Sequence, residues 1–225
     1  DIDLPNIIIA VIVIFVTIAL LYVWKRKRTS KSDVLFTGLC DSGKTLLFSH
    51  IVLGEEKTTF TSIKENVGYI QTSRGELRVV DIPGHERLRL KFFDQYKNFA
   101  KALTFIVDSV TIQKDIRDAA DYLYTLLSDK ATSSLPVAIL CNKQDETLAK
   151  GESVIQSLFE KEFNLVRQTR KNQLESVDES TKDSVFLGRS DKDFEFSQLS
   201  QNIKFISCSA KDKSFDDLVI WLETI

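Results

Sequence analysis

The segment Gly38–Thr45, GLCDSGKT, limits what this chain can fold into, because it matches G-x-x-x-x-G-K-[ST] at every fixed position. The run before it (33–38, DVLFTG) predicts a strand, and the run after it (45–54, TLLFSHIVLG) predicts a helix. Glycines in such a loop let backbone N–H groups close around phosphate oxygens, while the lysine adds charge and the hydroxyl can bind Mg²⁺. A chance Gly-rich turn would not explain the flanking strand and helix. We therefore expect a phosphate-binding loop made of Gly38, Leu39, Cys40, Asp41, Ser42, Gly43, Lys44 and Thr45.

Short apolar runs alternate with helical periods from residue 33 onward. The turn Ser73-Arg74-Gly75 separates two strand-like runs and predicts an antiparallel hairpin. We expect strands at 33–38, 66–72, 76–82, 102–108, 136–142 and 203–209, and helices at 45–54, 87–100, 112–129, 153–166 and 214–225. This order predicts an α/β domain with a mostly parallel, doubly wound sheet and one antiparallel hairpin.

Three further motifs each follow an expected strand. In the first, Asp81-Ile82-Pro83-Gly84, the carboxylate can hold Mg²⁺ through water, and the Gly84 N–H can contact a γ-phosphate. In the second, Asn142-Lys143-Gln144-Asp145, the last carboxylate can accept from N1–H and the 2-amino group of guanine, and the Lys143 stem can lie on the base.

The last motif is Ser209-Ala210-Lys211, in which the Ala210 N–H can bond the guanine O6. Each of these short motifs is common alone, but four in this order at strand ends predict a guanine-nucleotide site with Mg²⁺. Asp145 and Ala210 together disfavour an enzyme that uses ATP.

The N-terminal part of the chain contains an uncharged apolar run from Ile7 to Trp24, followed at once by the basic block 25–28, KRKR. A helix of this length spans about 27 Å, close to the hydrocarbon thickness of a bilayer. The positive-inside rule places the basic block in the cytosol. A cleaved signal peptide is the alternative, but its positive charge would precede the apolar run. We expect an anchor over 1–24, a basic linker over 25–32 and a cytosolic domain over 33–225.

Composition excludes several other classes of protein. The net charge is -2, with 30 basic and 32 acidic residues, so a surface that binds nucleic acid is not expected. The chain has three cysteines and two histidines, without C-x-x-C spacing, which argues against zinc and against a disulfide framework. Residues 167–202 are polar and carry both signs of charge, which predicts a mobile insertion with Phe194 and Phe196 packed at its end.

Residues 33–225 resemble the small GTPase superfamily, and most closely its Arf/Sar branch. With GLCDSGKT, DIPGHERLR, CNKQD and the N-terminal anchor, the chain resembles the β-subunit family of signal recognition particle receptors. The resemblance implies a GTP-binding regulatory subunit that tethers the receptor α subunit, through its N-terminal domain, to the endoplasmic reticulum for co-translational protein targeting. It implies GTP or GDP with Mg²⁺, slow hydrolysis, and further contact with the ribosome or translocon.

The resemblance also implies two switch segments, around 57–64 and 84–93, that a GTP-dependent partner would contact. Either Thr61 or Ser62 would supply the second Mg²⁺ hydroxyl. His85 stands where related GTPases often orient the attacking water, so it is a candidate catalytic residue; a partner-contact histidine is the alternative. Two other functions stay open: an Arf-like trafficking GTPase, and a scaffold that GTP stabilises without meaningful turnover.

Overall fold

The computed structural model describes residues 12–18, 31–54, 64–176 and 185–225 of the chain. The chain divides into two compact units, Asp1–Lys31 and Ser32–Ile225. In the first unit, residues 12–18 are helical and their side chains are exposed. Within the described residues, no helix is long and apolar enough to cross a membrane. The rest of the expected span 7–24, and the basic block 25–28, lie outside the described residues.

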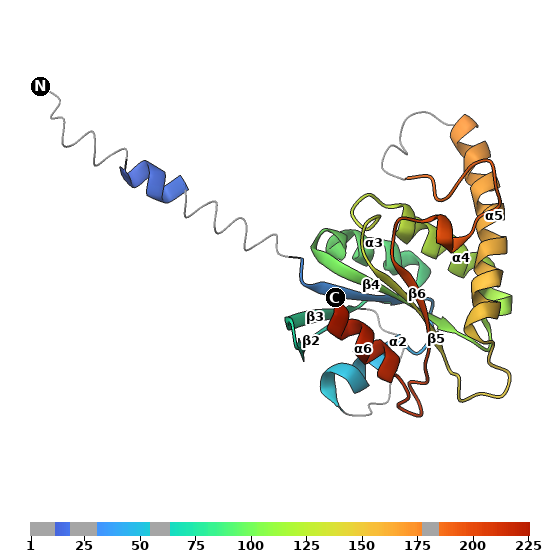
Figure 1. Ribbon diagram of the computed structural model, residues 1–225, viewed down its shortest axis with the longest axis horizontal. Helices are drawn as coiled ribbons and strands as arrows, with labels where there is room; N and C mark the ends of the chain where they lie inside the picture. The colour runs from blue at the N-terminus through green and yellow to red at the C-terminus, as the bar shows by residue number, and fades with distance from the viewer. Residues whose placement is uncertain (1–11, 19–30, 55–63, 177–184) are drawn as a thin grey trace, which may run out of the picture. The chain divides into compact units, whose positions relative to one another are not determined.

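The second unit is built on a six-stranded sheet with the order β2-β3-β1-β4-β5-β6 (Figure 1). Only β2 and β3 pair in antiparallel fashion, and the other neighbours are parallel, which confirms the predicted α/β class. Its strands are β1 (Asp33–Gly38), β2 (Asn66–Thr72), β3 (Gly75–Asp81), β4 (Ala100–Asp108), β5 (Val137–Asn142) and β6 (Ile203–Ser207).

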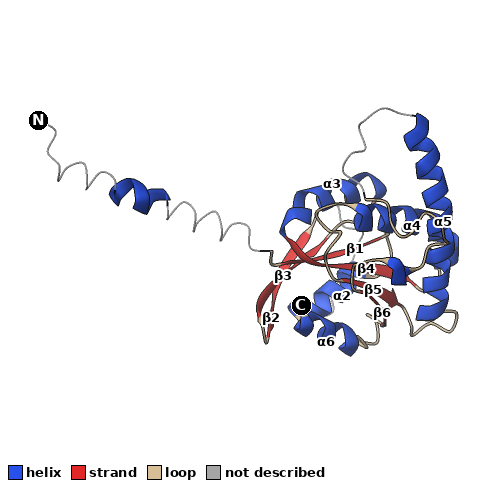
Figure 2. Ribbon diagram, turned by 45° about the horizontal axis from the view of Figure 1, so that its top comes forward, coloured by secondary structure: helices blue, strands red, loops and turns tan. Residues whose placement is uncertain are grey.

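Helices cover both faces of this sheet, as Figure 2 shows. The helical elements are α2 (Lys44–Phe48), η1 (Ser49–Leu53), α3 (Glu86–Tyr96), η2 (Lys97–Phe99), α4 (Ile112–Ser128), α5 (Glu152–Ser176), η3 (Phe196–Gln198) and α6 (Asp216–Thr224). One hydrophobic cluster packs α3, α4 and α5 on the sheet, and a second packs α2 and α6 on the opposite face. Buried strands with apolar side chains on both faces produce this two-sided core.

Two helix predictions were wrong at their ends. The expected helix 45–54 is α-helical only as far as Phe48 and continues as the π-helix η1. The expected helix 153–166 runs on to Ser176, well into the segment that was expected to be an insertion from Arg167. No glycine or proline interrupts residues 152–187, so the local sequence contains none of the strong helix breakers there.

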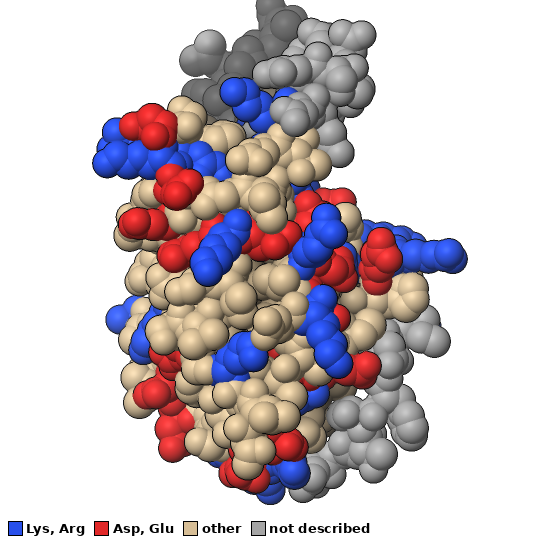
Figure 3. Space-filling view, turned by 90° about the vertical axis from the view of Figure 1, so that its right-hand side faces the viewer, with Lys and Arg blue, Asp and Glu red and all other residues tan. Residues whose placement is uncertain are grey.

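The described part of the expected insertion packs against α5. Arg167 is buried, and its guanidinium donates to the backbone oxygens of Lys192 and Arg189. Phe194 and Phe196 are buried beside Phe163 of α5, with ring centroids 4.9 and 5.5 Å away, as the sequence suggested. Segment 185–202 is therefore fixed by an aromatic cluster and a buried cation. Basic and acidic side chains are interspersed on the face of the molecule that Figure 3 shows.

Candidate nucleotide-binding site

The loop between β1 and α2 has the backbone that its glycines were expected to supply. Gly38 and Gly43 have φ values of 138° and 89°, and Asp41 has 58°. A Cβ at Gly38 would lie 2.2 Å from the Ile106 carbonyl oxygen, and one at Gly43 would lie 2.2 Å from Asn142 Nδ2. Both positions therefore require glycine, for backbone conformation and for space.

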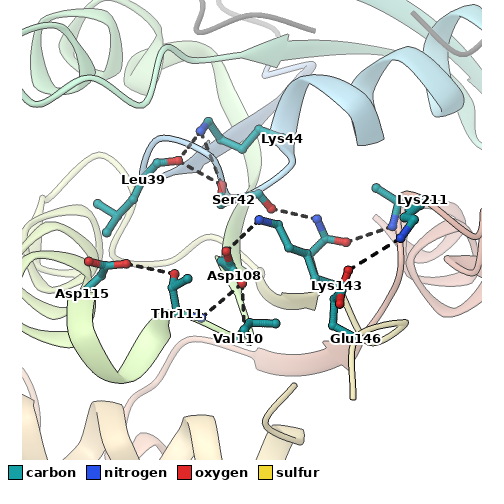
Figure 4. Close-up of polar contacts among 12 residues, drawn as sticks. Leu39, Ser42, Lys44, Asp108, Val110, Thr111, Asp115, Lys143, Glu146 and Lys211 are labelled. Carbon is teal, nitrogen blue, oxygen red and sulfur yellow. Dashed lines mark hydrogen bonds and ion pairs between the residues drawn. The ribbon is translucent and has the colours of Figure 1, made fainter. Parts of the chain in front are cut away.

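Lys44 places a positive charge inside this loop (Figure 4). Its side chain is buried, and Nζ donates to the backbone oxygen of Leu39 at 2.6 Å and to Ser42 Oγ at 3.5 Å. Burial lowers the pKa of the Lys44 ammonium, although the nearby Asp81 carboxylate raises it. A buried cation that is only partly compensated, in a loop at the start of a helix, favours a bound anion.

Asp81 lies at the end of β3, next to the first turn of α2. Its Oδ2 accepts hydrogen bonds from Thr45 Oγ1 at 2.8 Å and from Asn66 Nδ2 at 3.0 Å. Its Oδ1 is buried and has no hydrogen-bond partner among the described residues, and burial raises the pKa of the carboxyl group. A hydroxyl and a carboxylate with an unsatisfied buried oxygen fit the hard oxygen donors that Mg²⁺ prefers.

The motif that begins at Asp81 brings Gly84 directly against the phosphate-binding loop. A Cβ at Gly84 would lie 2.6 Å from backbone atoms of Leu39 and Cys40, and 2.7 Å from Lys44 Nζ. The structure therefore places Gly84 beside the Lys44 ammonium, and its predicted contact with a γ-phosphate stays a prediction.

The second half of the site is joined to the first by Asn142. Its Nδ2 donates to the Ser42 backbone oxygen at 2.8 Å, and its Oδ1 accepts from the Ala210 N–H at 2.9 Å. One buried amide side chain therefore connects the loop after β1 with the loops after β5 and β6. Segments more than sixty residues apart meet here because the parallel strands all end at the same edge of the sheet.

Charged side chains in this second half are paired with one another. Asp145 accepts from Ser209 Oγ at 2.7 Å and forms an ion pair with Lys211 at 3.4 Å. The Ser209 hydrogen bond lowers the pKa of the Asp145 carboxyl, and the contact with Asp145 raises that of Lys211. Lys143 adopts a φ of 67° and donates through Nζ to Asp108 Oδ2 at 2.7 Å. The predicted residues of this half are thus brought together with their charges already compensated.

Of the two expected switch segments, 57–64 and 84–93, the structure describes residues 64 and 84–93. Thr61 and Ser62 lie outside the described residues, so the second hydroxyl is not placed. His85 is exposed and stands at the N-cap of α3, where its Nδ1 accepts from the Arg87 N–H at 3.3 Å. Arg87 is exposed, but Arg89 is buried, so the expected switch segment 84–93 is not exposed along its whole length.

The charge of the buried Arg89 is compensated by an acidic side chain of α4. Its guanidinium donates two hydrogen bonds to the Asp118 carboxylate of α4, from Nη1 to Oδ2 at 2.9 Å and from Nη2 to Oδ1. The guanidinium also lies 4.6 Å from the centroid of the Tyr122 ring. An arginine at this position therefore fixes α3 to α4. Leu90 remains 43% exposed and Leu88 is half-buried, so the surface that α3 offers contains apolar as well as charged side chains.

Sequence reasoning missed three residues of this region: Asn66, Arg89 and Asp108. Asn66 could have been found from the hairpin register, because it pairs with Asp81 across the β2–β3 ladder. Asp108 carried a weaker signal, an acidic residue at the end of an apolar strand. Nothing in the local pattern distinguishes Arg89 from its charged neighbours.

Fold and site together define a protein of the small-GTPase fold class with a phosphate-binding loop. The family model described as "Signal recognition particle receptor beta subunit" matches residues 29–203, and the chain belongs to this family.

Two kinds of relative agree with this assignment. The chain is 40% identical to the signal recognition particle receptor subunit beta of Rattus norvegicus over 238 residues, which cover 100% of this chain and 88% of that protein. A solved structure of the mammalian SRP receptor is 40% identical, with a TM-score of 0.75 over 85% of this chain and 98% of the other. The SRb-GTP/SRX complex from Chaetomium thermophilum has the same fold at 20% identity, with a TM-score of 0.67 over 87% and 99% of the two chains.

Proposed function

We propose that the chain binds GTP and GDP with Mg²⁺ and works as a membrane-anchored regulatory subunit of a signal recognition particle receptor. The observation that carries the proposal is the pair of hydrogen bonds made by the Asn142 side chain. They join the phosphate-binding loop, with its buried Lys44 cation, to the loops that carry the ionised Asp145 carboxylate. In this proposal, phosphates contact residues 38–45 and Gly84, while Thr45 and Asp81, the latter through water, hold Mg²⁺. The metal ion would neutralise phosphate charge when it is bound.

Guanine selection is assigned to Asn142, Lys143, Asp145, Ser209, Ala210 and Lys211. Asp145 is the residue that distinguishes the bases, because an ionised carboxylate accepts from N1–H and the 2-amino group of guanine, and adenine offers no such pair. The Ser209 hydrogen bond, which lowers the pKa of the Asp145 carboxyl, supports this role. The Ala210 N–H, which the sequence suggested could bond the guanine O6, donates to Asn142 Oδ1 at 2.9 Å in the structure.

A nucleotide-stabilised scaffold is the second candidate function, and the geometry of His85 favours it. An Nδ1 that accepts a hydrogen bond carries no proton, so neutral His85 holds its proton on Nε2 and can only donate there. In that state His85 can donate from Nε2 to an attacking water but cannot take a proton from it. We expect His85→Ala to change single-turnover GTP hydrolysis by less than about threefold; a loss of tenfold or more would restore His85 as a catalytic residue.

The proposed domain organisation keeps an anchor over 1–24, with the span at 7–24, a linker over 25–32 and a GTPase domain over 33–225. Its support is the apolar run followed by KRKR, and the family suggests the endoplasmic reticulum as the membrane. The full chain should resist alkaline carbonate extraction, and its GTPase domain should be open to protease added from the cytosolic side. Protection of residues 44–225 in sealed microsomes would reverse the topology.

The proposed partner is the N-terminal domain of the receptor α subunit, bound through the switch segments when GTP is present. Exposed Arg87 and Leu90 on α3 supply a mixed polar and apolar surface, while the buried Arg89 contact holds this helix in place. Ribosome and translocon are further partners that the family role suggests. Interspersed charges on the α5 side give no basic patch there for nucleic acid (Figure 3).

Affinity for that α-subunit domain, measured in GTP and in GDP, tests the proposal. We expect about hundredfold tighter binding with GTP, which corresponds to about 2.7 kcal/mol of contacts made only in that state. Arg87→Glu should weaken the complex with nucleotide still bound, and Lys161→Glu, an exposed charge reversal on α5, is the matched control. Equal affinities in GTP and GDP would exclude the switch and leave the scaffold.

A further inference from the structure

Asp108 lies at the end of β4, next to the guanine-selecting loop (Figure 4). In the β4–β5 pairing it stands opposite Asn142, and the Ser109 N–H donates to the Asn142 backbone oxygen at 3.1 Å. The end of β4 is therefore held against the residue that immediately precedes Lys143. This placement brings a carboxylate from a different strand to the base-binding half of the site.

The two oxygens of Asp108 have different partners. Oδ1 accepts from the N–H groups of Val110 at 2.9 Å and Thr111 at 3.3 Å, at the start of α4. Oδ2 accepts from Lys143 Nζ at 2.7 Å. The two hydrogen bonds to Oδ1 stabilise the start of α4. They do not account for Oδ2, whose hydrogen bond among the described residues comes from Lys143.

The contact with Lys143 is well protected. The Asp108 side chain is 12% exposed and that of Lys143 is 35% exposed. Burial raises the pKa of the Asp108 carboxyl, yet the hydrogen bonds from Lys143, Val110 and Thr111 outweigh it, and the pKa is lowered. Asp108 is thus a carboxylate at neutral pH and attracts the ammonium with its full charge.

The backbone of Lys143 shows why this attraction matters. Its φ of 67° lies in the left-handed region, which a residue with a side chain rarely adopts unless its surroundings impose it. Two neighbouring contacts hold the same loop, because the Gln144 side chain donates to Ser109 Oγ at 2.9 Å and to the Lys150 backbone oxygen at 3.0 Å. The end of β4 therefore positions two consecutive residues of the guanine-selecting motif.

We propose that Asp108 is a positioning residue for bound guanine nucleotide. Its carboxylate anchors the Lys143 ammonium, which keeps the aliphatic stem of this flexible side chain along the surface that the base contacts, and so prolongs the lifetime of the bound nucleotide. The proposal rests on the proposed function, because it assigns Lys143 to the guanine base. It adds that the lysine is held by a partner outside the four recognised motifs.

The test is the rate of dissociation of fluorescent GDP from the full chain in detergent, with excess Mg²⁺. Asp108→Asn keeps an amide oxygen for the two N–H groups of α4 but removes the charge opposite Lys143. We expect dissociation about tenfold faster. Asp115→Asn is the matched control, because Asp115 is an exposed carboxylate in the first turn of α4 and accepts from Thr111 Oγ1 at 2.9 Å. GDP should dissociate from this variant at a rate within twofold of wild type.

Lys143→Met separates the ion pair from the stem, because methionine keeps an unbranched apolar chain and loses the ammonium. We expect the same increase as for Asp108→Asn, and no further increase in the double variant, since both changes remove one interaction. A role confined to the start of α4 predicts effects that multiply in the double variant, which would overturn the proposal. A Lys143→Met rate within twofold of wild type would also overturn it, and this variant decides the question if Asp108→Asn does not fold.

The experiment distinguishes this proposal from the function on which it rests. If the wild-type chain shows no saturable GDP binding, the guanine-nucleotide function itself is wrong. If the wild type binds GDP and the two single variants fail to speed its release, only the role of Asp108 is wrong.

Discussion

The nucleotide site has a phosphate half around residues 38–45 and Asp81, and a base half around residues 142–145 and 209–211. The pKa values of the charged groups are shifted in opposite directions in the two halves. In the phosphate half, burial lowers the pKa of Lys44 and raises that of Asp81, so both groups are shifted toward their neutral forms. In the base half, hydrogen bonds lower the pKa of Asp145 and raise that of Lys211, so both are shifted toward their charged forms. Lys44 and Asp81 are 6% and 1% exposed, whereas in the base half the Lys211 side chain is 70% exposed and that of Asp145 is 7% exposed.

This difference indicates which half depends on ligand. Buried charges without full compensation destabilise a protein, and an anion with its metal ion would supply what Lys44 and the orphaned Asp81 oxygen lack. The base half needs no ligand to compensate its charges. We therefore infer that the base half is preorganised, and that nucleotide and Mg²⁺ stabilise mainly the phosphate half.

Loss of the junction between the halves should have the largest effect. Gly43→Ala would put a Cβ 2.2 Å from Asn142 Nδ2 at a φ of 89°, which breaks the bridge and strains the loop. We expect GDP affinity to fall more than a hundredfold, and the free energy of unfolding to fall by about 2–4 kcal/mol. Gly151→Ala is the control, since no atom lies within 4 Å of its Cβ position. Unchanged GDP binding in Gly43→Ala would show that the halves work independently.

A change confined to the base half should alter selectivity and leave phosphate binding intact. Asp145→Asn replaces an acceptor with a donor, which opposes the 2-amino group of guanine and suits the 2-oxo group of xanthine. We expect GTP affinity to fall ten- to hundredfold, for a loss of about 1.5–3 kcal/mol, while XTP affinity rises. Competition titrations of GTP, XTP and ATP measure this directly; a variant that still prefers GTP would remove Asp145 from base selection.

Much of this comparison could be predicted from the sequence, because both halves are built from contiguous motifs at strand ends. The strand β1 and the positions of Lys44 and Asp145 follow from local pattern alone. The pairing of Asp108 with Lys143 depends on the alignment of β4 with β5, which a single sequence does not determine, whereas that of Asn66 with Asp81 follows from the hairpin register. The length of α5 was missed because its polar second half is held by long-range contacts, of Arg167 with the backbone of Lys192 and of Arg170 with Asp121 of α4.

The phosphate half should show its dependence on ligand in thermal unfolding. Asp81→Asn removes a buried charge, so the Tm of the ligand-free protein should stay unchanged or rise by up to about 3 °C. The extra stabilisation that Mg²⁺ gives to the GDP complex should disappear in the same variant. Asp193→Asn, at an exposed carboxylate, should match wild type in both states. A fall in Tm of several degrees without ligand would show that Asp81 is already compensated.

The smallest effect concerns the pH dependence of stability. Asp108 has a lowered pKa in the folded state, so it contributes stability above its unfolded value of about 3.9, and this contribution is lost as pH falls through the folded value. The difference in unfolding free energy between wild type and Asp108→Asn should therefore be constant from pH 7 to 5 and shrink below about pH 4.

Asp81 has the opposite sign, because its pKa is raised. Its contribution to the ligand-free protein is present at low pH and is lost as pH rises through the folded value. Urea unfolding of wild type, Asp108→Asn and Asp81→Asn between pH 3 and 7 measures both trends. Parallel curves for the two variants would contradict the contrast between the halves.

The central claim is that one site joins phosphate binding to guanine selection, and the affinities of GDP and ADP for the full chain test it most directly. Both nucleotides offer the same phosphates to residues 38–45, so any preference must come from the base half. With Mg²⁺ present, we expect GDP to bind at least a hundredfold more tightly than ADP, as measured by titration calorimetry. Equal affinities for GDP and ADP would contradict the account, because phosphate binding would then occur without guanine selection.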